Sequence, residues 1–198
     1  PFTPIMEALA RADIRIVLAR QERVAGNMAD GVSRSTNGRQ VGVFTVQQSA
    51  GAENAFAPIA QAFTDSSPVL FIPGHPGTQK ADVPPTFDGM ANYASTVKRA
   101  LRPYSPEAVP QRLRIAFGAL RSGRPGPVMV EMPADVCGAD FDGELVYEPV
   151  AAMRTAADPG AVQETAERLL AARSPFIWAG QGVLYAEASD ELRAVAEL

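Results

Sequence analysis

The chain has 198 residues, with 18 lysines and arginines against 22 aspartates and glutamates, so its formal net charge is −4. This charge argues against a basic nucleic-acid-binding module, and 46% hydrophobic with 20% charged residues is typical of a globular chain rather than a disordered one. No apolar stretch approaches the roughly 18 residues that cross a bilayer, and the first residues lack a basic region followed by an apolar one. We therefore expect a cytoplasmic protein that binds neither nucleic acid nor membrane.

Strands and helices alternate along most of the chain, as judged from apolar residues that recur every second or every third to fourth position. The pattern predicts, in order, a helix over 5–10, a strand over 14–18, a helix from Glu22 to about Gly38, a strand over 41–46, a helix over 53–63, a strand over 69–72, a long loop over 73–85, a helix over 106–121 and a strand over 128–132. Such alternation predicts a doubly wound α/β fold with a mainly parallel sheet and helices on both faces.

The predicted domain organisation is an α/β domain over 1–136, a linker over 137–157 and the truncated start of a second α/β domain over 158–198. Acidic, proline and glycine residues interrupt every periodic pattern in the linker. Asp158 and Pro159 then have the residue types that cap and begin a helix, and a strand over 175–179 and a helix from Glu187 follow. The chain starts without Met and stops within a helical pattern, so we expect it to be part of a longer protein.

Glu22 is the first candidate functional residue. It follows a predicted strand and begins a helix, which places its carboxyl group at the carboxyl edge of the sheet, where open α/β sheets bind ligands. A glutamate at this position also complements the positive end of the helix dipole, and position by itself leaves both interpretations open.

The turn from Gln48 to Asn54 follows the next strand at the same edge. Its small residues allow a ligand to approach the backbone closely. Because the chain has neither the Lys-Ser/Thr of a P-loop nor a G-x-G-x-x-G fingerprint, a nucleotide-binding Rossmann protein is the least favoured interpretation.

His75 and Cys137 are the only histidine and the only cysteine. His75 follows a third strand, in a loop dense in Pro and Gly, where an imidazole could exchange protons with a ligand or simply be solvated. Cys137 has no neighbouring base and is expected to be a passive thiol. Asp30 and Asp65 show no metal-like clustering, and we assign no metal ligand in this chain.

Three segments together resemble the N-terminal, pyrimidine-binding domain of thiamine diphosphate enzymes of the acetolactate synthase and benzoylformate decarboxylase type. The resemblance covers about residues 1–136 and continues weakly from Asp158 into the central domain of that family. The segments are Arg20–Gly31, Gln48–Asn54 with Ala62–Pro68, and Gly123–Val128.

The resemblance implies roles for particular residues. Glu22 would hydrogen-bond a ring nitrogen of the aminopyrimidine and so promote formation of the thiazolium ylid. Ser49, Gly51 and Asn54 would lie against the cofactor, and Gln47, Gln48 and His75 are substrate-side candidates. His75 stands where synthases carry Gln, and the histidine of the decarboxylase falls on Gln47, so the departures concern the substrate more than the cofactor.

The resemblance also implies Mg²⁺, whose ligands in the family come from a Gly-Asp-Gly segment and a later Asn-Asn pair that this chain lacks. Metal and diphosphate ligands are therefore expected in a missing C-terminal domain, and the site is expected between subunits of a homodimer or homotetramer. The implied function is a lyase or transferase that decarboxylates or ligates a 2-oxo acid or related carbonyl substrate. The alternatives are a non-ligating decarboxylase like benzoylformate decarboxylase and a non-catalytic binding domain of the same fold.

Overall fold

The computed structural model describes residues 3–81, 83–151, 153 and 155–198. Residues 1, 2 and 82 of the predicted first domain, and residues 152 and 154 of the predicted linker, lie outside the described residues. Contacts between residues divide the chain into two units, Pro1–Ala152 and Met153–Leu198.

The first unit is built on a parallel sheet whose strands are β1 (Gly42–Val46), β2 (Val69–His75), β4 (Val128–Val130) and β3 (Arg99–Leu101), in that spatial order. A short strand β5 (Met132–Pro133) pairs with the end of β2. Every pairing is parallel. The strands are nearly continuous apolar runs because helices cover both faces of the sheet.

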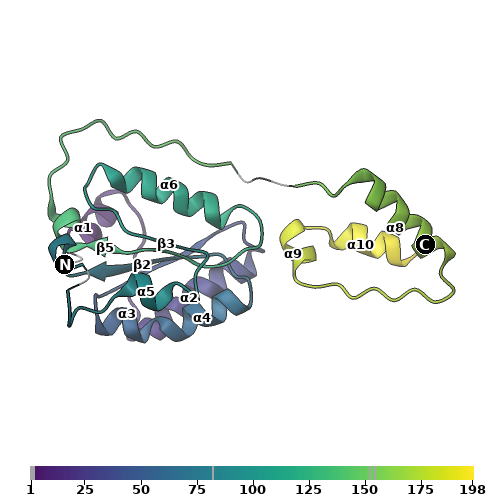
Figure 1. The fold of residues 1–198 in the computed structure, drawn as a ribbon, viewed down its shortest axis with the longest axis horizontal. Helices are drawn as coiled ribbons and strands as arrows, with labels where there is room; N and C mark the ends of the chain where they lie inside the picture. Colours follow the sequence, from purple (N-terminus) through teal and green to yellow (C-terminus); the bar gives the residue numbers. More distant parts are fainter. Residues whose placement is uncertain (1–2, 82, 152, 154) are drawn as a thin grey trace. The chain divides into compact units, whose positions relative to one another are not determined.

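Helices lie on the two sides of this sheet (Figure 1). α6 (Ala108–Leu120) lies on one side, and α2 (Glu22–Ser35), α3 (Ala50–Asn54) and α4 (Phe56–Thr64) lie on the other. Two apolar cores result, one around Phe71 and Ile59 and the other around Leu70 and Leu120. The remaining helices of the unit are α1 (Thr3–Arg11), the 3-10 turn η1 (Thr78–Lys80), α5 (Gly89–Tyr93) and α7 (Ala134–Gly138). The predicted doubly wound α/β fold with a parallel sheet is confirmed.

The predicted strand over 14–18 is wrong. The segment is irregular, and Leu18 is 95% exposed. Branched side chains favour a strand, but a strand forms only when a neighbour accepts its backbone hydrogen bonds. The predicted strand over 175–179 is wrong for the same reason, and Trp178 is 88% exposed.

Several helix boundaries have local causes. α2 ends in two backbone hydrogen bonds, from Asn37 to the Arg34 carbonyl and from Gly38 to the Ser33 carbonyl, with Asn37 in the left-handed conformation at φ 50°. These bonds form a Schellman motif, which explains the stop predicted near Gly38.

The single helix predicted over 53–63 is instead α3 and α4, separated at Ala55. Pro58 has no N–H to donate, so it fits only the first turn of a new helix.

The prediction missed β3 and α5 and placed α7 partly in the linker, because elements of three to five residues are too short for a period to be recognised. The predicted loop over 73–85 begins too early, since β2 continues through His75.

The second unit contains α8 (Pro159–Ala171), α9 (Gly182–Ala186) and α10 (Ser189–Ala196). The Asp158 carboxylate accepts the Ala161 N–H at 3.0 Å and caps α8, as its residue type predicts. In the described parts of both units, no helix combines the length and the apolar character that crossing a membrane requires.

Candidate functional site

The carboxyl ends of the parallel strands meet at one edge of the sheet, which is where ligands bind in folds of this class. Gln47 follows β1, His75 ends β2, Arg102 follows β3 and Glu131 follows β4. Polar side chains therefore follow or end each of the four adjacent strands.

Glu22, Gly51 and Asn54 form one contact group at this edge, which we call the Glu22 group. Glu22 is the first residue of α2, and its Oε2 lies 3.5 Å from the Asn54 side-chain nitrogen. A Cβ added to Gly51 would lie 3.6 Å from Glu22 Oε1 and 3.1 Å from the Cβ of Gln47. The half-buried carboxylate thus lies beside a stretch of backbone without a side chain, although the strand expected before it does not form.

The turn between β1 and α3 brings Gly51 to this position. Ser49 has a φ of 55° and a ψ of −111°, a conformation that non-glycine residues rarely adopt. Its side chain makes no capping hydrogen bond to α3. Gln48 Oε1 is buried and has no hydrogen-bond partner in the described structure. An unpaired buried acceptor is costly, and a donor from outside the chain, such as water or a ligand, can satisfy it. Asp30 Oδ1 and Ser67 Oγ are likewise buried without a partner in the described structure.

His75 lies elsewhere on the same edge and is 1% exposed, so the expectation of a loop histidine is wrong. Its Nδ1 accepts the Gly77 N–H at 3.2 Å, which leaves Nε2 to carry the proton of the neutral ring. Burial lowers the pKa of His75, and the charge of Arg102 lowers it further, against the opposing charges of Asp135 and Asp88. Within the described residues, no hydrogen bond or ion pair joins the His75 side chain to the Glu22 group. Because its pKa is lowered, the imidazole is uncharged at neutral pH.

Asp88, Arg102 and Glu131 form a second group, which we call the Arg102 cluster. Arg102 is 4% exposed and Glu131 1%, and both Nε and Nη2 of the arginine lie 2.6 Å from Glu131 Oε2. Asp88 Oδ1 lies 3.9 Å from Arg102 Nη2. Burial raises the pKa of Glu131 despite the neighbouring guanidinium. The pairing compensates for burying both charges.

The Arg102 cluster was not among the sites predicted from the sequence. One signal was available, since Glu131 interrupts the apolar run from Val128 to Met132, and a charged residue within a buried strand needs a partner of opposite charge. The sequence does not show which of the 18 basic residues is that partner.

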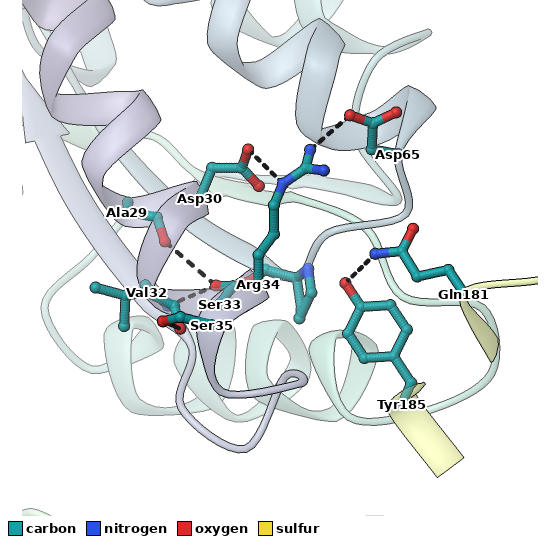
Figure 2. A network of polar contacts seen from close by, with 11 residues as sticks. Ala29, Asp30, Val32, Ser33, Arg34, Ser35, Asp65, Gln181 and Tyr185 are labelled. Carbon is teal, nitrogen blue, oxygen red and sulfur yellow. Dashed lines mark hydrogen bonds and ion pairs between the residues drawn. The ribbon is translucent and has the colours of Figure 1, made fainter. Parts of the chain in front are cut away.

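Asp30 and Asp65, the two carboxylates that the sequence left without a role, both bind Arg34 (Figure 2). Arg34 Nε donates to Asp30 Oδ2 at 2.8 Å, and Nη2 donates to Asp65 Oδ2 at 2.6 Å. The guanidinium connects α2 to the end of α4, so these contacts have a structural role.

Two further features lie apart from the Glu22 group. Cys137 is half-buried in α7, and burial raises the pKa of its thiol, which disfavours the reactive thiolate. A hollow of about 470 Å³ near the amino end of β3 is lined by Phe63, Lys98 and Arg124 among others. Among the described His, Cys, Asp and Glu side chains, no three gather as a metal ion would require.

Comparison with known proteins relates the chain to one family. Residues 1–96 match the family described as thiamine pyrophosphate enzyme, N-terminal TPP binding domain. The chain is 31% identical over 206 residues to the probable acetolactate synthase large subunit of Methanocaldococcus jannaschii, covering 98% of this chain and 34% of the relative. It is 34% identical over 208 residues to the glyoxylate carboligase of Escherichia coli O157:H7, covering 100% of this chain and 34% of the relative. The chain therefore spans about a third of the length of these relatives.

A solved structure supports the fold. The benzoylformate decarboxylase of Polynucleobacter necessarius matches with a TM-score of 0.82 at 23% identity, covering 98% of this chain and 37% of that one. The segments quoted from the sequence, the doubly wound fold and the family match agree. Residues 1–96 of the chain belong to the N-terminal TPP binding domain of the thiamine pyrophosphate enzyme family.

Proposed function

We propose that this chain forms the pyrimidine-binding part of a thiamine diphosphate-dependent enzyme that acts on a 2-oxo acid or a related carbonyl substrate. The observation that carries the proposal is the Glu22 carboxylate held beside the bare backbone of Gly51, at the carboxyl edge of a parallel sheet. A carboxyl group at this place can share a proton with a ring nitrogen.

The residues present fit a flat heteroaromatic ring. Gly51 has no side chain to block a close approach, and Gln48 Oε1 is a buried acceptor that needs a donor. Glu22, Ser49, Gly51 and Asn54 would hold the aminopyrimidine. When bound, thiamine diphosphate supplies an acidic thiazolium carbon and an electron sink for reactions beside a carbonyl group.

In this proposal Glu22 holds a proton at a ring nitrogen, and Asn54 orients the Glu22 carboxylate through its side-chain amide. Gln47, Gln48 and His75 are proposed on the substrate side. The neutral His75 would act as a hydrogen-bond donor from Nε2 rather than as a cation.

The relatives support carboligation as the first reaction class, because two of them are named acetolactate synthase and glyoxylate carboligase. Decarboxylation without ligation is the second candidate. A screen of 2-oxo acids with the full-length protein, following carbon dioxide and any ligated product, distinguishes the two.

Other parts of the proposal rest on the resemblance to the family. They are Mg²⁺ bound by residues outside this chain and a homodimer or homotetramer with the site between subunits. A cytoplasmic location, and the division into a domain over 1–136, a linker over 137–157 and the start of a central domain over 158–198, are proposed from the sequence pattern.

The decisive experiment replaces Glu22 with Gln in the full-length protein. Without an ionisable carboxyl group, hydrogen–deuterium exchange at the thiazolium carbon of bound cofactor should slow by about 100-fold or more. Glu53→Gln is the matched control, because Glu53 is an exposed glutamate in neighbouring α3, and it should exchange at the wild-type rate. Unchanged exchange in Glu22→Gln would contradict the proposal. Failure of the wild-type protein to bind thiamine diphosphate with Mg²⁺ in calorimetry would favour a non-catalytic domain.

A further inference from the structure

The helix α5 contacts the Arg102 cluster at one end and, at the other, α3, the helix that carries Gly51 and Asn54 of the Glu22 group. It is five residues long, begins after Asp88 and ends at Tyr93. An isolated helix of this length is unstable, so its position depends on what holds its two ends.

The Arg102 cluster holds the first end. Asp88 caps α5 by accepting the Ala91 N–H at 3.1 Å, and the same carboxylate faces Arg102. Gly89 approaches Glu131 so closely that an added Cβ would overlap the carboxylate, and the Gly89 backbone donates a hydrogen bond to it. The beginning of α5 is therefore fixed to β3 and β4.

Tyr93 holds the second end. Its side chain is fully buried. The centroid of its ring lies 5.1 Å from the ring centroid of Phe71 and 5.5 Å from that of Phe56. The Tyr93 hydroxyl donates a hydrogen bond to the Ala52 carbonyl. Burial raises the pKa of Tyr93, so the hydroxyl keeps its proton and its role as donor.

Ala52 is the residue after Gly51. α3 is also only five residues long and has no side-chain cap, so it depends on tertiary contacts for its position. The tyrosine hydroxyl binds α3 one residue from the backbone that faces Glu22.

We propose that Tyr93 is a positioning residue for the pyrimidine site, acting through α3 to set the separation between the Gly51 backbone and the Glu22 carboxylate. The inference rests on the proposed function for its link to the cofactor. We call α5 a brace because the Arg102 cluster fixes its first end, and Tyr93 at its second end fixes α3 and so the position of the Gly51 backbone.

Tyr93→Phe in the full-length protein tests the proposal, because it removes the hydroxyl and keeps the ring packing. Without cofactor, amide hydrogen exchange of Glu53 and Ala55, whose N–H groups bind the Ser49 and Gly51 carbonyls, should accelerate about tenfold. The dissociation constant for thiamine diphosphate should rise by roughly threefold to tenfold. Exchange in β2 and β4 should be unchanged.

Tyr147→Phe is the matched control, since Tyr147 is exposed and lies outside the sheet, and it should leave both quantities at wild-type values. Asp88→Ala, at a half-buried position, removes the cap that holds the first end of α5 and should accelerate exchange of the same two amides. Wild-type exchange at Glu53 and Ala55 in both Tyr93→Phe and Asp88→Ala would overturn the inference. Glu22→Gln could leave hydrogen–deuterium exchange at the thiazolium carbon at the wild-type rate while Tyr93→Phe accelerates amide exchange at Glu53 and Ala55. That result would contradict the proposed function but support the role of α5 as a brace.

Discussion

The Glu22 group and the Arg102 cluster lie at the same edge of one sheet, but their polar atoms are paired to different extents. In the Arg102 cluster the guanidinium is paired with Glu131, and both side chains are almost fully buried. In the Glu22 group the side-chain hydrogen bond from Asn54 to the carboxylate is 3.5 Å long. Nearby Gln48 Oε1 has no partner in the described structure.

This difference separates a structural polar group from one suited to a ligand. Burying a charge is tolerated where the protein itself supplies the counter-charge, as it does at Arg102. An acceptor buried without a partner in the protein can be satisfied by a donor from a ligand. Stability should therefore depend mainly on the Arg102 cluster, and ligand binding mainly on the Glu22 group.

The largest expected effect is on stability. Glu131→Ala leaves the buried Arg102 without its hydrogen-bonded counter-charge and with only Asp88 at 3.9 Å, and the free energy of unfolding should fall by about 3–5 kcal/mol in urea denaturation. Glu148→Ala is the control, because Glu148 is an exposed partner of Arg114 at 3.8 Å and should change the value by less than about 0.5 kcal/mol. Equal effects at the two positions would remove the distinction between the groups.

A smaller effect is expected on ligand binding. Gly51→Ala places a methyl group against Glu22 and Gln47, so the dissociation constant for thiamine diphosphate should rise about tenfold, or about 1.4 kcal/mol. The free energy of unfolding should stay within about 1 kcal/mol of wild type, because alanine is the better helix former. Gly31→Ala is the matched control, since nothing lies within 4 Å of a Cβ at that glycine. Unchanged affinity in Gly51→Ala would count against a ring beside this backbone.

The smallest expected effect is the pH dependence of stability at His75, the only histidine of the chain. Its pKa is lower in the folded protein than in the unfolded chain, so unfolding takes up a proton as the pH falls below about 6.5. The free energy of unfolding should decrease from about pH 7 to pH 5.5, and this slope should be shallower in His75→Gln. Thermal unfolding followed at several pH values measures both slopes, and identical slopes would place the imidazole in solvent.

The apolar strands and the alternation of elements could be predicted from the sequence because they depend on local periodicity. Val41–Val46 and Val69–Ile72 predict buried parallel strands, and β1 and β2 are found there. The Asp158 cap and the stop after Asn37 also depend on residues within one turn of the helix end. The predicted sheet edge pointed to Glu22 and to the turn Gln48–Asn54, the resemblance gave them roles, and the structure brings Glu22 and Gly51 together.

Other features were decided by contacts between distant segments. Ile14–Leu18 has the composition of a strand but no strand partner, and His75 changed from an expected loop residue to a buried strand end because β5 pairs beside it. Glu131 and Arg102 are hydrogen-bonded across 29 residues of sequence, and Tyr93 and Ala52 are hydrogen-bonded across 41. Local residue preferences cannot predict such pairs, because the pairs stabilise the fold only when both partners are buried, and this burial exists only once the sheet has formed.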